Sequence, residues 1–251
     1  MDIIILTALG IGGATVVGAL IGFLFKNVSR RMSDAILGFA AGVMLAAAIL
    51  GLILPSMETA GKSGIWMTAA GILCGAFFLN AADRLTPHLH HLTGVDIESH
   101  EHNASLNKVL LFVMAIAIHN LPEGLAAGVS SGSGDPGSAL TVALGIALQN
   151  IPEGMIIISP MLLNGVSKGR AFLIASLTGL VEVIGTFIGY FAAGISGAVL
   201  PFALAFAGGT MLYVISDEMI PETHSGGHER LATYSLLMGV IVMILMDTWA
   251  G

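Results

Sequence analysis

Two short segments in the middle of the chain combine side chains that bind metal ions. They read His119-Asn120-Leu121-Pro122-Glu123-Gly124 and Gln149-Asn150-Ile151-Pro152-Glu153-Gly154. Residues three and four apart share one face of a helix, so each segment presents an imidazole or amide, a second amide and a carboxylate together. Mixed nitrogen and oxygen ligands suit borderline divalent ions such as zinc, iron and manganese. The pair of segments therefore predicts a metal site.

Each segment also contains a proline that interrupts helical hydrogen bonding. Pro122 cannot donate to the carbonyl of Ile118, and Pro152 cannot donate to that of Leu148. At membrane depth such a break is tolerated only where protein or a cavity satisfies the backbone. A lone histidine in such a helix is often an interhelical contact, but two matching copies of the motif favour metal binding.

Glu182 is a third acid in the middle of another apolar segment. If it faces the same cavity, three carboxylates could hold two adjacent metal ions bridged by Glu123 and Glu153, because a cation relieves the repulsion between acids. The alternative is a hydrogen bond from Glu182 to a hydroxyl such as that of Thr178 or Thr186. The nearby repeat favours the ligand role.

The composition places these acids in a membrane protein. The chain has 251 residues, of which 55% are hydrophobic and 10% charged, and its mean hydropathy is +0.91. A soluble domain carries about 25% charged residues, so lipid must cover this surface. The 33 glycines suit closely packed transmembrane helices. A single cysteine, Cys74, excludes an intramolecular disulfide and a thiolate cluster.

Eight segments have the roughly 20 mostly apolar residues that a membrane-spanning helix needs. They are 3–25, 34–56, 65–83, 107–130, 138–162, 170–192, 200–217 and 231–250. Lys and Arg favour cytoplasmic loops, and in this topology all basic residues except Lys62 lie on one side: Lys26, Arg30, Arg31, Arg84, Lys108, Lys168, Arg170 and Arg230. This asymmetry predicts a multi-pass protein of the plasma membrane with both termini outside the cytoplasm.

The longest gap, residues 84–106, holds five of the eight histidines: His88, His90, His91, His100 and His102. It is interpreted as a flexible cytoplasmic loop of a single membrane domain that covers residues 1–251. Clustered imidazoles bind zinc and similar ions, so this loop is either a solvated connection or a weak metal-collecting segment.

The two motif copies lie in consecutive spans, which run antiparallel. They are therefore related by a two-fold axis near the membrane plane, the relation found in inverted-repeat transporters.

These motifs resemble the ZIP family of metal transporters, in particular its bacterial GufA-like branch. Further matching stretches are Ala-Gly-Val-Met44-Leu-Ala-Ala, Thr-Pro-His88, Ser-Asp217-Glu218-Met-Ile-Pro-Glu-Thr-His224 and Met-Asp247-Thr. The resemblance implies an all-α fold of about eight helices in a three-two-three inverted-repeat arrangement. Spans one to three would mirror spans six to eight around the central pair.

The resemblance also implies a binuclear metal centre and a transport path. The first site would use His119, Glu123, Gln149 and Glu153, and the second Asn120, Glu123, Asn150, Glu153 and Glu182. Met44 and Met211 look like soft ligands near the path, and Glu58 like an acid at the outer entrance. The cytoplasmic release route would use Asp217, Glu218, His228, His88 and His90.

Three positions depart from the family pattern. Many members have a second histidine where this chain has Gln149, whose amide oxygen is a weaker ligand. Asn120 and Asn150 stand where relatives can carry an acid, which removes charge from the second site. Asp217 stands where a relative can have histidine.

The leading hypothesis is import of a divalent metal ion into the cytoplasm by elevator-like alternating access. Zn²⁺ is the foremost substrate, with Cd²⁺, Fe²⁺ and Mn²⁺ as alternatives. The expected partners are the metal ion, the lipid bilayer and a second copy in a homodimer, but no nucleic acid. An intramembrane zinc hydrolase, which would use metal-bound water, is disfavoured because the chain lacks HExxH and has only one histidine inside a span. A cation channel without dedicated metal sites is the third hypothesis.

Overall fold

A computed structural model describes residues 2–25, 28–92 and 104–250 of the chain. At residues 2, 63, 83–92, 104–115 and 250 it describes the backbone alone. The sequence predictions for His88, His90 and His91 therefore lie outside the described side chains, and those for His100 and His102 outside the described residues. The described part is helical and contains no strand.

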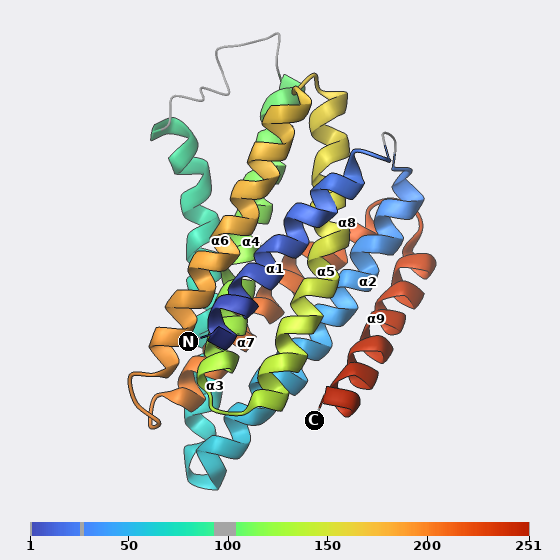
Figure 1. Cartoon of the computed structure of the whole chain (residues 1–251). Helices are drawn as coiled ribbons and strands as arrows, with labels where there is room; N and C mark the ends of the chain where they lie inside the picture. The colour runs from blue at the N-terminus through green and yellow to red at the C-terminus, as the bar shows by residue number, and fades with distance from the viewer. Residues whose placement is uncertain (1, 26–27, 93–103, 251) are drawn as a thin grey trace.

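The helices form one bundle with both chain termini at the same end (Figure 1). In order they are α1 (Asp2–Gly22), α2 (Arg30–Ala48), the π-helix η1 (Ile49–Ile53), α3 (Leu54–Leu92), α4 (Ala104–Gly132), α5 (Pro136–Leu163), α6 (Lys168–Ala193), α7 (Leu200–Val214), the π-helix η2 (Ile215–Met219), α8 (Ile220–His224) and α9 (Glu229–Ala250). Among the described residues, seven helical stretches are long and apolar enough to cross a membrane. The 29-residue α4, part of whose side chains is not described, is long enough to be an eighth.

The chain reverses between the second and third spans at a glycine. Gly61 has φ of 64°, a left-handed conformation that glycine adopts at little cost. It divides α3, so that one span runs over Arg30–Lys62 and the next over Gly64–Ala82.

The loop predicted at 84–106 is too long. Helix α3 continues to Leu92, and α4 begins at Ala104. Leu85, Leu89 and Leu92 recur at the three- and four-residue spacing of a helix. The loop was predicted over these residues because they lie among several histidines.

The helices pack in pairs that obey an approximate two-fold relation. Helix α1 packs against α5, as α6 packs against α4, and α2 packs against α9, as α3 packs against α7. The pairs α1–α6 and α4–α5 each contain a helix and its own counterpart. This pairing agrees with the expected arrangement of three, two and three spans.

The two π-helices are a second internal correspondence. Each is followed within two residues by a proline, Pro55 after η1 and Pro221 after η2. Because proline cannot donate a backbone hydrogen bond, Pro55 leaves the carbonyl of Gly51 without its usual helical partner. The Ser138 hydroxyl donates to that carbonyl instead, at 3.2 Å. At both places the helix widens directly before a proline.

Candidate metal site

The structure brings the two motifs together deep inside the bundle. Asn120 and Glu123 on α4 and Gln149 and Asn150 on α5 are all at most 1% exposed. Glu182 on α6 is completely buried as well. Seven side chains predicted as ligands thus belong to three neighbouring helices, with His119 on α4 and Glu153 on α5 completing the set.

The final glycine of each motif allows a close approach of helices. A Cβ atom on Gly124 would lie 2.3 Å from the carbonyl oxygen of Glu182, and one on Gly154 would lie 2.2 Å from that of Thr15. Neither position could hold a side chain without moving backbone. The glycines therefore let α6 approach the first motif and α1 approach the second.

An amide joins the two motifs directly. Gln149 donates through Nε2 to Oε1 of Glu123 at 2.6 Å. This hydrogen bond fixes one oxygen of the Glu123 carboxyl group and links α4 to α5. The other oxygen, Oε2, has no hydrogen-bond partner among the described residues.

Glu182 accepts hydrogen bonds from three helices. Its Oε1 atom accepts from the Thr15 hydroxyl at 2.6 Å and from Asn120 Nδ2 at 2.7 Å. Its Oε2 atom accepts from Asn150 Nδ2 at 2.5 Å. Asn150 Nδ2 also lies 3.2 Å from the carbonyl oxygen of Ile11.

The two hydroxyl groups expected as alternative partners of the Glu182 carboxyl group do not donate to it. Thr178 donates to the carbonyl of Ala175, and Thr186 donates to the backbone carbonyl of Glu182 rather than to its carboxyl group. The hydroxyl partner is Thr15 on α1. Sequence reasoning missed Thr15 because a lone threonine in an apolar span has no distinguishing spacing.

The motif residues share an unusual feature, a buried acceptor oxygen without a donor. Within the described part of the chain, the atoms concerned are Asn120 Oδ1, Glu123 Oε2, Gln149 Oε1, Asn150 Oδ1 and Glu153 Oε1. An unsatisfied buried polar group costs about 1–3 kcal/mol. A cation bound among these oxygens would satisfy several of them at once.

Carboxylates and imidazole alone do not form a compact site. No three His, Cys, Asp or Glu side chains with described positions gather closely enough to hold a metal ion. A metal site between the motifs would also have to use amide oxygens, and those of Gln149, Asn120 and Asn150 lie on the same helices as the acids.

A cavity of about 850 Å³ reaches the motifs from one end of the bundle. Its lining includes His119, Glu123 and Glu153 of the motifs. It also includes Arg30 at the start of α2 and Glu222 on α8. Three predicted path residues also line it: Met44, Asp217 and Glu218.

The cavity includes a contact between the first motif and η2. His119 Nε2 lies 2.5 Å from Glu218 Oε2, and both side chains are largely buried. The predicted ligand and the predicted release acid are therefore direct neighbours.

Among the predicted path residues whose side chains are described, three lie apart from this cavity lining. Met211 is fully buried in the core. Glu58 is exposed and lines a separate shallow pocket of about 410 Å³ together with Lys62. His228 contacts Asp34 rather than a motif residue.

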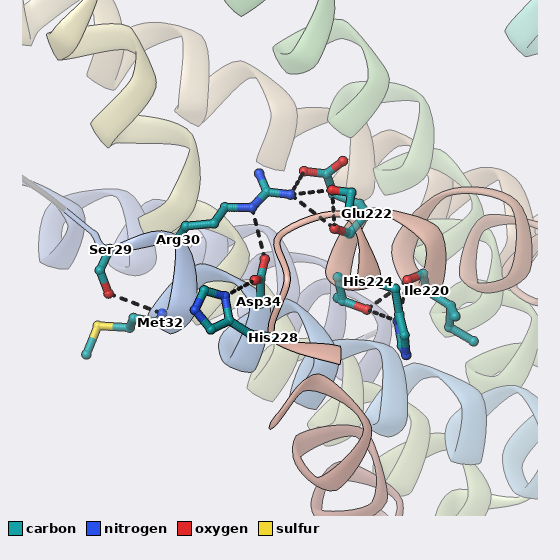
Figure 2. Close-up of polar contacts among 10 residues, drawn as sticks. Ser29, Arg30, Met32, Asp34, Ile220, Glu222, His224 and His228 are labelled. Carbon is teal, nitrogen blue, oxygen red and sulfur yellow. Dashed lines mark hydrogen bonds and ion pairs between the residues drawn. The ribbon is translucent and has the colours of Figure 1, made fainter. Parts of the chain in front are cut away.

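Asp34 is the centre of an ionic cluster at the α2 end of the cavity (Figure 2). Its side chain is only 3% exposed and lies 3.1 Å from Arg30 Nε and 3.0 Å from His228 Nδ1. Arg30 Nη2 also lies 2.9 Å from Glu222 Oε1. The cluster ties α2 to α8 and to the turn before α9. Arg30 and Asp34 belong to no motif, and although Glu222 lies in a stretch that resembles the family, the sequence did not predict that these residues would pair.

Together these features define a polytopic membrane protein with an internal two-fold relation and a buried site of carboxylate, amide and imidazole groups, open to one end. The sequence profile of the family described as ZIP zinc transporter matches residues 98–247. The chain is 42% identical to the zinc transporter GufA of Myxococcus xanthus, over 96% of each chain. It is 39% identical to the zinc transporter ZIPB of Bordetella bronchiseptica, over 95% of this chain and 78% of that one.

A more distant relative is the human zinc transporter ZIP11, at 32% identity over 95% of this chain and 94% of that one. The chain belongs to the ZIP family, as its motifs predicted, and it is a GufA-like member. The family is one of transporters and not of enzymes, which confirms the expectation that the chain is not an enzyme.

Proposed function

We propose that this protein carries a divalent transition metal ion, zinc foremost, across the plasma membrane into the cytoplasm. The observation that carries the proposal is the set of buried acceptor oxygens on both motifs, next to a cavity that leads to one end of the bundle. The names of the relatives, all zinc transporters, agree with this substrate. Cadmium, iron and manganese suit the same donor types.

His119, Glu123, Gln149 and Glu153 are the proposed ligands of the transported ion. The Gln149 amide group has two roles, because its nitrogen donates to Glu123 while its oxygen has no donor among the residues with described side chains. Oxygen-rich ligation binds zinc more loosely than the thiolates of structural zinc sites. Loose binding suits a carrier, since the ion must leave after it has crossed.

The proposed direction rests on charge. Helices α2, α6 and α9 begin at the end opposite the termini (Figure 1), and their first turns carry Arg30, Lys168 and Arg230. Basic residues favour the cytoplasmic side. The cavity reaches this same end through Arg30. The proposal therefore has the site open to the cytoplasm and both termini outside.

The proposed movement separates two groups of helices. Helices α1, α4, α5 and α6 carry the motifs and their supports, while α2, α3, α7 and α9 pair among themselves. Elevator-like sliding of the first group would break the contact between His119 and Glu218, which joins the groups. While the two side chains are in contact, as in this structure, Glu218 is placed to accept the ion from His119 on its way to the cytoplasm.

The test is zinc uptake by proteoliposomes that contain purified protein. Glu153→Ala should reduce uptake to the level of protein-free vesicles, because it removes a carboxylate ligand. The matched control is Glu229→Ala, an exposed acid at the start of α9 that is not part of the cavity lining, and it should transport like the unmodified protein. Uptake that survives in folded Glu153→Ala and Glu123→Ala would contradict the proposal.

A further inference from the structure

Glu182 differs from the other two buried acids in its surroundings. Glu123 and Glu153 each retain an oxygen without a donor in the described part of the chain. Both oxygens of Glu182 accept hydrogen bonds, from Thr15, Asn120 and Asn150. These four residues, called the Glu182 cluster below, connect α1, α4, α5 and α6.

The two asparagines direct their amide nitrogens toward Glu182. An amide nitrogen is a donor only, and its hydrogens carry partial positive charge. A metal ion that approached the same carboxyl oxygens would meet these hydrogens, and rotating an amide would break its hydrogen bond to Glu182. The cluster therefore opposes metal binding by Glu182, and the Oδ1 atoms of both asparagines have no hydrogen-bond partner in the part of the chain that the structure describes.

Charge leads to the same conclusion. Glu123 and Glu153, when ionised, balance one divalent cation, and burying a second divalent cation without further anions is costly. The third acid is held by its neighbours, and positions 120 and 150 carry neutral amides.

We propose that the site between the motifs holds a single divalent ion, and that Glu182 is an internal anchor which Thr15, Asn120 and Asn150 hold away from it. This inference rests on the proposed function and revises the expectation of a binuclear centre. Thr15, Asn120 and Asn150 act as positioning residues. The anchor also joins α4 and α5, which carry the motifs, to α1 and α6.

The test counts ions bound per chain by equilibrium dialysis of purified protein against Zn²⁺. The double variant E123A/E153A gives the background from other sites, including the histidine-rich segment, and is subtracted. The unmodified protein should bind one ion above this background. Asn150→Asp should bind two, because aspartate cannot donate to Glu182 and adds a charge.

Further variants separate anchoring from ligation. Glu182→Gln should bind the single ion with an affinity within about threefold of that of the unmodified protein. Loss of a true ligand should instead lower the affinity by about tenfold or more, where a factor of ten equals 1.4 kcal/mol. In the Asn150→Asp background, Thr15→Val should raise the affinity for the second ion, and Thr15→Ser, which keeps the hydroxyl, should not. A purely structural role of Thr15 would not produce that gain.

The outcomes distinguish this inference from the proposed function. Two motif-dependent ions in the unmodified protein, or loss of its single ion in folded Glu182→Gln, would overturn the single-ion proposal and leave metal transport intact. No motif-dependent ion in any variant would overturn both. One ion that becomes two in Asn150→Asp supports the proposal.

Discussion

Gln149 illustrates how much a single residue type decides. It stands at the position that His119 occupies in the first motif, so the site has one imidazole instead of two. The sequence alone predicted its proximity to Glu123, because both belong to matching motifs. The sequence could not predict that its nitrogen would hold Glu123 Oε1, since the orientation of an amide depends on its neighbours in space.

Gln149→His should bind zinc more tightly. Imidazole is a better zinc ligand than an amide oxygen, so we expect about a tenfold increase in affinity, a gain of 1.4 kcal/mol, with slower release of the ion. Competition between zinc and manganese during uptake measures the change in preference, which should move toward zinc. Gln149→Leu is the control and should weaken the binding of both zinc and manganese. An unaltered preference for zinc over manganese in Gln149→His would contradict the proposed ligand role of Gln149.

Proton competition is a second consequence at the residue scale. Carboxylates and imidazole bind metal only when deprotonated. Lowering the pH protonates these groups and weakens binding, so zinc uptake should increase as the pH rises through the acid range. Initial uptake rates at fixed free zinc measure the effect. A flat profile would exclude proton competition at the motifs.

Helix packing explains why each motif ends in glycine. The sequence predicted the helices of the motifs from their hydrophobic length, but it could not show which backbone each glycine touches. Gly154 lies against Thr15 of α1, and Gly124 lies against Glu182 of α6. These contacts bring Thr15 and Glu182 within hydrogen-bonding distance of each other.

Gly154→Ala should destabilise the protein. Its new methyl group would lie 2.2 Å from the carbonyl oxygen of Thr15, and overpacking of this kind costs about 1–3 kcal/mol. Gly13→Ala, on the α1 side of the same helix pair but with no atom within 4 Å of the added Cβ, is the control. Thermal unfolding in detergent should show a lower midpoint for Gly154→Ala alone. Equal midpoints would mean that the approach of α1 and α5 is not as tight as described.

The ionic cluster around Asp34 makes a prediction at the same scale. Asp34→Asn removes a nearly buried charge that Arg30 and His228 share. Because Arg30 is about half exposed, we expect a loss of only about 1 kcal/mol in unfolding free energy. Zinc affinity at the motifs should remain unchanged, as measured by dialysis. A change in affinity as large as that of Glu153→Ala would instead assign Asp34 to the metal site.

At the scale of the whole molecule, repetition organises the site. The motif repeat is visible in the sequence because both copies keep their residue types. The relation between the outer helices is hardly visible, because Thr15 in α1 occupies the place that Glu182 occupies in α6, each against a motif glycine. Only packing reveals that correspondence. The symmetric frame therefore carries an asymmetric site, with one imidazole and one anchoring acid.

The central claim is that metal ions cross by way of the paired motifs. The most direct test is the initial rate of zinc uptake into proteoliposomes as a function of external zinc concentration. We expect a rate that saturates, is inhibited by cadmium, and falls to the background of empty vesicles in Glu123→Ala. A rate that increases linearly without saturation, or that is equal in Glu123→Ala and the unmodified protein, would contradict it.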